Sequence, residues 1–164
     1  MGASSEGLRA YKMLHLQQVF LLTSAHEGGI KPHVIPQIWA MPASFSPELV
    51  AVAVANDRFT HVLISRTREF VLNVPGADIS EKVWACAPPG EGKDKFARAG
   101  LTPVKAEKVC APLVKECLAA IECRVASEEP AGDHTLFIGE VVAKHRFREG
   151  RVLLNAPGRH EFKA

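Results

Sequence analysis

A proline-rich segment, His33–Pro47, carries residues whose types and spacing could bind a planar ring. Its sequence is HVIPQIWAMPASFSP, so Trp39 lies among prolines at the end of a β-forming stretch. Proline lacks a backbone N–H and leaves neighbouring groups unpaired at a sheet edge. Such an edge can hydrogen-bond the alternating donors and acceptors of a heteroaromatic ring, with Trp39 as an aromatic wall and Ser44 as an added hydroxyl. From these residues alone, a structural edge strand with a core tryptophan remains the simpler interpretation.

Motifs of the common catalytic classes are absent from the sequence. It contains no GxGxxG, GxxxxGK, HExxH or GxSxG pattern, so any nicotinamide must bind without a Rossmann fingerprint. His26, His33, His61 and His134 are too scattered to form a metal-binding spacing. We therefore predict no metal ligand and no catalytic acid–base residue.

The elements that must position this segment are mostly short strands. β-Branched and apolar runs between turn residues predict strands at Val19–Ser24, His33–Trp39, Leu49–Ala55, Phe70–Val74, Leu118–Val125, Thr135–Ala143 and Arg151–Leu154. The prolines place His33–Trp39 at an edge or a bulge. The two long strands are joined by a predicted turn at Glu129–Asp133.

Three short helices complete the predicted elements. Thr60–Arg66 has helical spacing with Thr60 as a plausible N-cap, and Ile79–Ala85 and Asp94–Ala99 follow, the last ended by Gly100. Glu27–Gly29 is expected to be a hairpin loop and Pro88–Gly92 an irregular loop. Because strands dominate and tight turns join neighbours, the fold class is mainly β, an antiparallel barrel with peripheral short helices.

Length and composition limit the classes of protein to which the chain can belong. A chain of 164 residues indicates one domain over 1–164, with a flexible N-terminus at 1–12 and a tail at 155–164. The formal charge is only +2, and the one dense basic stretch, Lys144–Arg151, is diluted by Glu149 and Gly150, which argues against nucleic-acid binding. No apolar run approaches the roughly 20 residues of a membrane helix, and Met1–Arg9 lacks the apolar core of a signal peptide. We therefore expect a cytoplasmic protein with reduced cysteines.

An ordered set of short motifs resembles the flavin reductase-like family, especially its small branch that includes flavoredoxins. Members of that branch have the pattern N-x-I-P-x-x-W-x-x-P-x-S-F-x-P-P. The chain matches it at Ile35, Pro36, Trp39, Pro42, Ser44, Phe45 and Pro47. The later family motifs are matched, in order, by Arg58-Phe59-Thr60, Phe70–Pro75, Asp94-Lys95-Phe96, Gly100-Leu101, Glu116–Cys123, Gly132-Asp133-His134 and Gly139-Glu140-Val141. Order and spacing, rather than any one motif, make the resemblance specific.

The resemblance implies FMN in a cleft at the dimer interface of an FMN-binding split β-barrel. Trp39 and the backbone around Ala40–Ala43 (Ala40, Met41, Pro42, Ala43) are expected to flank the isoalloxazine ring or the ribityl chain, with Ser44 beside them. Thr60 and Arg58 are expected to meet the phosphate, since a helix N-terminus and a guanidinium both suit an anion. Lys95 is expected to supply charge to the phosphate or to the N1–C2=O edge, and His134 to donate to the flavin or the phosphate. Phe162 in the tail is a further candidate to cover the ring.

Two positions depart from the family pattern. His33 stands where the family often has asparagine; a neutral imidazole also offers a donor and an acceptor, but in a larger ring. The second proline after Phe45 is absent, since Glu48 follows Pro47. We expect His33 still to contact the flavin or the phosphate.

The resemblance leaves three functions open. The first is an oxidoreductase that takes hydride from NADH or NADPH to FMN and passes electrons to a flavin, a metal complex or a protein. The second is a flavoredoxin-type electron carrier with a redox protein partner and little nicotinamide activity. The third is a flavin-binding protein without turnover. A homodimer is expected in each case, because so small a split barrel leaves its cleft open on one side.

Overall fold

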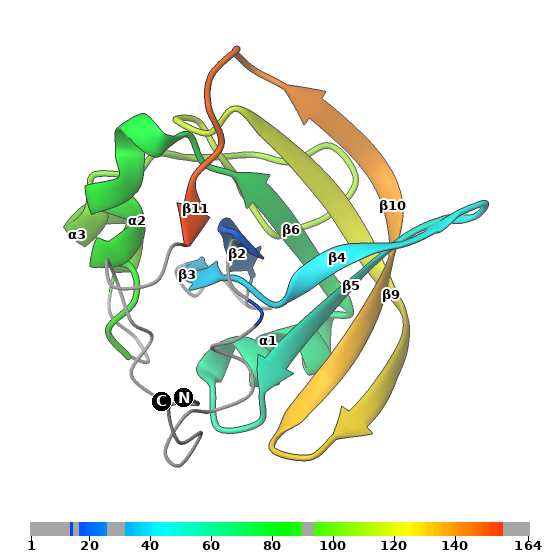
Figure 1. The fold of residues 1–164 in the computed structure, drawn as a ribbon. Helices are drawn as coiled ribbons and strands as arrows, with labels where there is room; N and C mark the ends of the chain where they lie inside the picture. The colour runs from blue at the N-terminus through cyan, green and yellow to red at the C-terminus, as the bar shows by residue number, and fades with distance from the viewer. Residues whose placement is uncertain (1–13, 15–16, 26–31, 90–93, 156–164) are drawn as a thin grey trace, which may run out of the picture.

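The fold is built on one large antiparallel sheet (Figure 1). The computed structural model describes residues 14, 17–25, 32–89 and 94–155. Seven strands pair in the order β3-β2-β6-β9-β10-β5-β4. Their bounds are β2 Phe20–Ser24, β3 His33–Gln37, β4 Ala40–Phe45, β5 Glu48–Ala55, β6 Glu69–Val74, β9 Ala119–Ala131 and β10 His134–Arg146. Every pairing is antiparallel, so the prediction of a mainly β fold is confirmed.

Short helices and two small strand pairs surround the sheet. The helices are α1 Phe59–Thr67, the 3₁₀ turn η2 Ala77–Ile79, α2 Ser80–Ala85 and α3 Lys95–Ala99. The small pairs join β1 Gln17–Gln18 with β11 Leu154–Asn155, and β7 Pro103–Val104 with β8 Leu113–Val114. Within the described residues, no helix is long and apolar enough to span a membrane.

The predicted edge character of the proline-rich segment is confirmed, but its two halves lie on different edges. β3 occupies one edge of the sheet order and β4 the other. The chain passes between these edges at Trp39, whose carbonyl accepts from the Ala53 N–H at 2.9 Å. The Gln37 amide donates to the Ala53 carbonyl at 2.8 Å. These bonds bring the two edges together and curl the sheet. Pro42 lies at the bulge of β4, where a missing N–H is tolerated.

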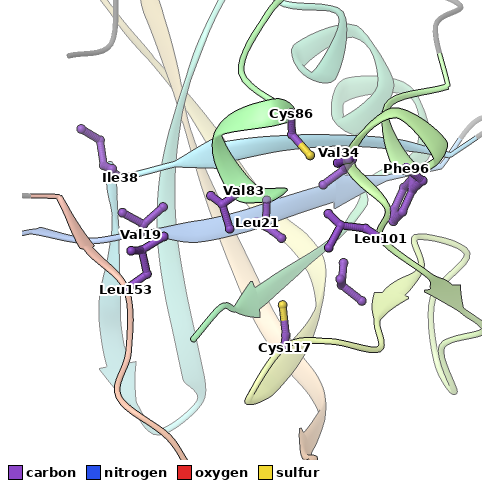
Figure 2. Close-up of a cluster of buried hydrophobic side chains, with 12 residues drawn as sticks. Val19, Leu21, Val34, Ile38, Val83, Cys86, Phe96, Leu101, Cys117 and Leu153 are labelled. Atoms are coloured by element: carbon purple, nitrogen blue, oxygen red, sulfur yellow. The ribbon is translucent and has the colours of Figure 1, made fainter. Parts of the chain in front are cut away.

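The two faces of the sheet carry separate hydrophobic cores. Leu21 of β2 belongs to a cluster with α2 and α3, whereas its neighbour Leu22 belongs to a cluster with Ile64 of α1. Figure 2 shows Val83 of α2, together with Phe96 of α3, directed towards the strands of the first cluster. Because side chains alternate along a strand, α1 covers one face of β2 and β3 while α2 and α3 cover the other. All three helices therefore lie against β3, from opposite faces of the sheet.

A glycine allows the long β9–β10 pair to pass close to the cluster that contains Leu22, Phe70 and Cys123, which we call the inner core. A shift in pairing register falls between Ile138 and Gly139. A Cβ on Gly139 would lie 2.5 Å from Cζ of Phe70 and 2.9 Å from Cβ of Cys123. Both neighbours are fully buried, so neither can move away easily.

We expect Gly139→Ala to lower the free energy of unfolding by about 1–3 kcal/mol, because the added methyl overpacks this contact. Denaturant unfolding of the variant beside Gly132→Ala measures the effect. Gly132 has nothing within 4 Å of its built Cβ, so its cost comes from its φ of +66° rather than from packing. A double variant with Phe70→Leu should recover part of the loss only for Gly139→Ala. Lack of recovery would contradict the overpacking explanation.

Three sequence predictions about the elements are wrong in detail. The five-residue turn at Glu129–Asp133 is a two-residue turn, because Gly132 at a φ of +66° permits a tight hairpin and β9 continues to Ala131. Pro130 is tolerated there since β9 beyond Arg124 has no β6 partner. Thr60 is not the N-cap: α1 begins at Phe59, and Arg58 is the N-cap. The last predicted strand is reduced to a bridge at Val152 and the short β11.

The other expected helices and strands are confirmed to within a few residues at each end. Gly100 ends α3 in the left-handed conformation, with a φ of 62°, as predicted. The predicted hairpin loop at Glu27–Gly29 and most of the loop at Pro88–Gly92 lie outside the described residues, as do the N-terminus 1–12 and all of the tail after Asn155.

Candidate functional site

Trp39 and His134 come together although they are far apart in the sequence. Their ring centroids lie 4.5 Å apart with an interplanar angle of 37°. Trp39 is held by backbone bonds on both sides, since its N–H donates to the Gln37 side-chain oxygen at 3.1 Å. His134 begins β10, and its Nδ1 lies 2.6 Å from the Asp133 carboxylate. Two predicted contact residues thus form one aromatic surface at the end of the sheet.

The first turn of α1 presents backbone N–H groups without the usual side-chain cap. Its N-cap Arg58 makes no capping bond, and no acidic residue stands in the first turn. The carboxylate of Asp57 lies 3.5 Å from Nε of Arg58 and is largely exposed. A helix start of this kind, with a guanidinium beside it, favours an anion.

Two hydroxyl groups near this turn are buried without a hydrogen-bond partner among the described residues. They are Oγ1 of Thr60 and Oγ of Ser24, and both side chains are fully buried. Thr60 lies four residues before Ile64 on one face of α1, and Ser24 lies two residues after Leu22 on one face of β2. Since Ile64 and Leu22 pack in one cluster, the two hydroxyls lie at the same end of that contact. A buried hydroxyl without a partner costs about 1–3 kcal/mol, so this position favours a polar ligand or water.

His33 lies directly opposite Ser24 in the β2–β3 pair. Its ring meets that of Phe59, at the start of α1, edge to face at 5.3 Å. Burial and the charge of Lys95 lower the pKa of His33 to about 4. The imidazole is therefore neutral at pH 7 and offers one donor and one acceptor.

Lys95 is a buried cation without a carboxylate partner among the described residues. Lys95 is only 2% exposed, and its ammonium donates to the Cys86 carbonyl at 3.0 Å. Burial lowers the pKa of Lys95 to about 8, and the charges of Arg98 and Arg58 act in the same direction. A buried ammonium with donors to spare is expensive unless an anion joins it. The charge of Arg58 reaches Lys95, so we treat Lys95, Arg58 and the start of α1 as a candidate anion-binding group.

The structure does not bring the β4 residues to this group within one chain. Ser44 of β4 pairs with Leu49 of β5, which pairs on its other side with Glu140 of β10. In the same way, Ala40 pairs with Val52, which pairs with Phe137 of β10. Ser44 is thus level with a position six residues along β10 from His134, or about 20 Å at the rise of a strand. Its hydroxyl accepts from the Ser46 N–H at 3.2 Å.

The other predicted residues of β4 differ in their burial. Ala40 is half-buried against the core near Trp39, whereas Met41, Pro42 and Ala43 are exposed along the edge. Phe162 lies outside the described residues. The described residues contain no group of three or more His, Cys, Asp or Glu that could hold a metal.

Ser24 is the site residue that the sequence did not indicate. It ends an apolar strand as an ordinary turn-flanking serine. Its missing hydrogen bond becomes visible only once α1 is placed over β2. The burial of Lys95 also could not be predicted from the sequence, because its helix is only five residues long and has no apolar periodicity.

The chain is similar to proteins of one flavin-related family. Residues 13–161 match the model of the flavin reductase like domain family. An uncharacterized protein from Archaeoglobus fulgidus is 38% identical over 155 residues, covering 92% of this chain and 86% of its own. The reductase component of a Rhodococcus opacus 4-nitrophenol 4-monooxygenase/4-nitrocatechol 2-monooxygenase is 30% identical over 124 residues, covering 76% of this chain and 63% of its own.

Solved structures share the fold. The NADH:FAD oxidoreductase of Streptomyces globisporus superposes with a TM-score of 0.84 at 24% identity, covering 100% of this chain and 97% of its own. The flavoredoxin of Desulfovibrio vulgaris (Miyazaki F) superposes with a TM-score of 0.78 at 27% identity, covering 100% of this chain and 96% of its own. The expected split barrel is confirmed by these likenesses.

Proposed function

The chain belongs to the flavin reductase-like family, and from this premise we propose that it is an FMN-binding oxidoreductase that uses NADH or NADPH. When bound, the flavin would supply the redox chemistry, accepting a hydride and releasing electrons to a flavin, a metal complex or a protein. The protein's own residues would bind, orient and shield the cofactor. Hydride transfer needs no acid–base pair, which agrees with the prediction of no catalytic residue.

The observation that carries this proposal is the buried Lys95 ammonium, whose charge reaches His33 and Arg58, together with the two hydroxyls of Thr60 and Ser24 that have no partner among the described residues. A phosphate would give Lys95 its missing counter-charge and would accept from Thr60 and Ser24. The start of α1 and Arg58 would add backbone and guanidinium donors. These groups fit a phosphate ester better than they fit an internal role, since each is otherwise left partly unsatisfied.

The same observation favours FMN over FAD. Thr60 and Ser24 are fully buried, and Lys95 is 2% exposed. A terminal phosphate suits such an enclosed group, whereas the pyrophosphate of FAD must leave room for adenosine beyond it. We expect FMN to bind more tightly than FAD, and riboflavin, which has no phosphate, to bind weakly.

The ring of the flavin would lie against Trp39 and His134. Their shared surface offers an aromatic face and a ring N–H. His33 is neutral and pairs with Ser24 between β3 and β2, so it would contribute a hydrogen-bond donor without adding charge. The position of His33 next to Phe59 supports the expectation that it still contacts the cofactor.

We expect Trp39→Ala to weaken FMN binding about tenfold, because it removes the aromatic wall of the ring site. Titration followed by flavin fluorescence measures the change, and Trp39→Phe should keep most of the affinity. Equal affinity for wild type and the alanine variant would show that Trp39 is only a core residue.

A homodimer would complete the site. Phe45 is fully exposed and Met41 is 60% exposed on the β4 edge. A second copy that covers this edge would bury them and would bring its own Ser44 towards the cofactor, which one chain alone does not. Light scattering on a size-exclusion column tests this proposal, and a monomer at micromolar concentration would contradict it.

The flavoredoxin-type carrier remains a second candidate, favoured by the likeness to the Desulfovibrio flavoredoxin along the whole chain. Anaerobic stopped-flow mixing of the FMN-loaded protein with NADH, and separately with NADPH, distinguishes the two. Bleaching of flavin absorbance within seconds supports the reductase. A flavin that bleaches only with a reduced protein donor supports the carrier.

A further inference from the structure

A hydrogen-bonded chain joins α1 to β10 outside the anion-binding group. Nε2 of His61 lies 2.9 Å from Oγ1 of Thr135, and that hydroxyl donates to the Asn56 side-chain oxygen at 2.9 Å. A hydroxyl has only one hydrogen to donate. The Thr135 hydroxyl therefore accepts from His61, which must carry its proton on Nε2.

The same residues also hold the turn before His134. The backbone N–H of Asn56 donates to the Asp133 carbonyl at 3.0 Å. Asp133 in turn places its carboxylate 2.6 Å from Nδ1 of His134. The side-chain oxygen of Asn56 thus accepts from the Thr135 hydroxyl, while its backbone N–H donates to the Asp133 carbonyl.

This chain of bonds connects the two halves of the proposed cofactor site. Arg58, the N-cap of α1, stands two residues after Asn56, and His134 stands immediately before Thr135. The His61 ring also packs on Phe137 at 5.4 Å, which restricts its orientation. These three side chains therefore add to the backbone pairing of His134 with Ala55 in tying the start of α1 to the Trp39–His134 surface.

We propose that His61, Thr135 and Asn56 form a brace that sets the spacing between the phosphate end and the ring end of the cofactor site. His61 and Thr135 are positioning residues that act through Arg58 and His134. The proposal rests on the proposed function, since it concerns a ligand that spans both ends. A ligand that engages only the ring end should not depend on the brace.

The test compares FMN with riboflavin in matched variants at position 135. We expect Thr135→Val, which keeps the side-chain shape, to weaken FMN binding about tenfold by removing two hydrogen bonds. Riboflavin affinity should stay within about twofold, and Thr135→Ser, which keeps the hydroxyl, should restore FMN affinity. Thr102→Val serves as control, because it removes an exposed hydroxyl bound to Glu116 away from the site. If Thr135→Val does not fold, His61→Phe and His61→Gln give the same comparison.

Each outcome decides the proposal. Loss of FMN affinity alone, with rescue by serine, supports the brace. Equal losses for FMN and riboflavin would show a general structural effect and overturn it, as would no loss for either. A wild-type protein that binds neither compound would overturn the proposed function and this inference together, whereas the two preceding results leave the proposed function intact.

Discussion

Replacing Lys95 with methionine is expected to weaken FMN binding by about 10- to 100-fold and to stabilise the FMN-free protein. Methionine keeps the length of the side chain but removes a cation that is buried without a carboxylate partner among the described residues. Removal of an unpaired buried charge relieves its desolvation cost. The same change deletes the charge that would meet the phosphate. Opposite effects on stability and affinity are typical of a residue retained for binding.

The matched control is Lys82→Met. Lys82 lies on α2, which packs against α3, is half-buried rather than fully buried, and donates to the Gly100 carbonyl at 2.7 Å. We expect this variant to bind FMN as the wild type does. Calorimetric unfolding and FMN titration of both variants measure the two effects. Loss of stability in Lys95→Met with unchanged FMN affinity would assign Lys95 to the cap of α2 alone.

The pH dependence follows from the same lysine. The pKa of Lys95 falls from its ordinary value of 10.5 to about 8 on folding. Between these values the unfolded chain binds more protons than the folded chain, so the free energy of unfolding should rise with pH across this window. FMN affinity should fall over the same window, because the ammonium of the free protein is being lost. In Lys95→Met both trends should be much weaker, and their persistence would point to another group.

Replacing Glu122 with alanine is expected to lower the free energy of unfolding by about 3–5 kcal/mol. This fully buried carboxylate accepts from three successive backbone N–H groups, of Glu107, Lys108 and Val109, at 2.9, 2.7 and 3.2 Å. Its fourth partner is Nε2 of His145 at 2.7 Å. The alanine variant would leave these donors without this acceptor, and that of Val109 is buried.

Chemical denaturation measures this loss, and Glu129→Ala, on the exposed end of the same strand, should change stability little. Burial alone would raise the pKa of Glu122, but the backbone donors and His145 hold it below its ordinary value of 4.5. The carboxylate therefore stabilises the fold above that pH, and the contribution is lost as the pH falls further. Glu122 lies on the opposite strand face from Cys123 of the inner core, so FMN affinity of the folded variant should be retained. A variant as stable as the wild type would contradict the role of Glu122 as an anchor for residues 107–109.

The sequence predicted most of the fold because local patterns agree with the final packing. Leu49–Ala55 and Phe70–Val74 are apolar runs and become central strands, and Gly100 ends its helix as expected. The prediction failed where tertiary contacts decide. Thr60 has the chemistry of an N-cap, but α1 starts one residue earlier and turns its hydroxyl inward.

The candidate site could be predicted only in part for the same reason. Trp39 and His134 were named separately, and nothing local indicates that their rings meet. Ser44 shares a motif with Trp39, yet the strand carries it away from His134. The pairing of Ser24 with His33 and the burial of Lys95 depend on which strands and helices become neighbours.

The central claim is tested most directly by titrating the purified protein with FMN and following the quenching or enhancement of flavin fluorescence. We predict saturable binding with one FMN per chain, tighter than FAD and much tighter than riboflavin. A protein that neither carries FMN after purification nor takes it up would contradict the claim, however closely its fold resembles that of its relatives.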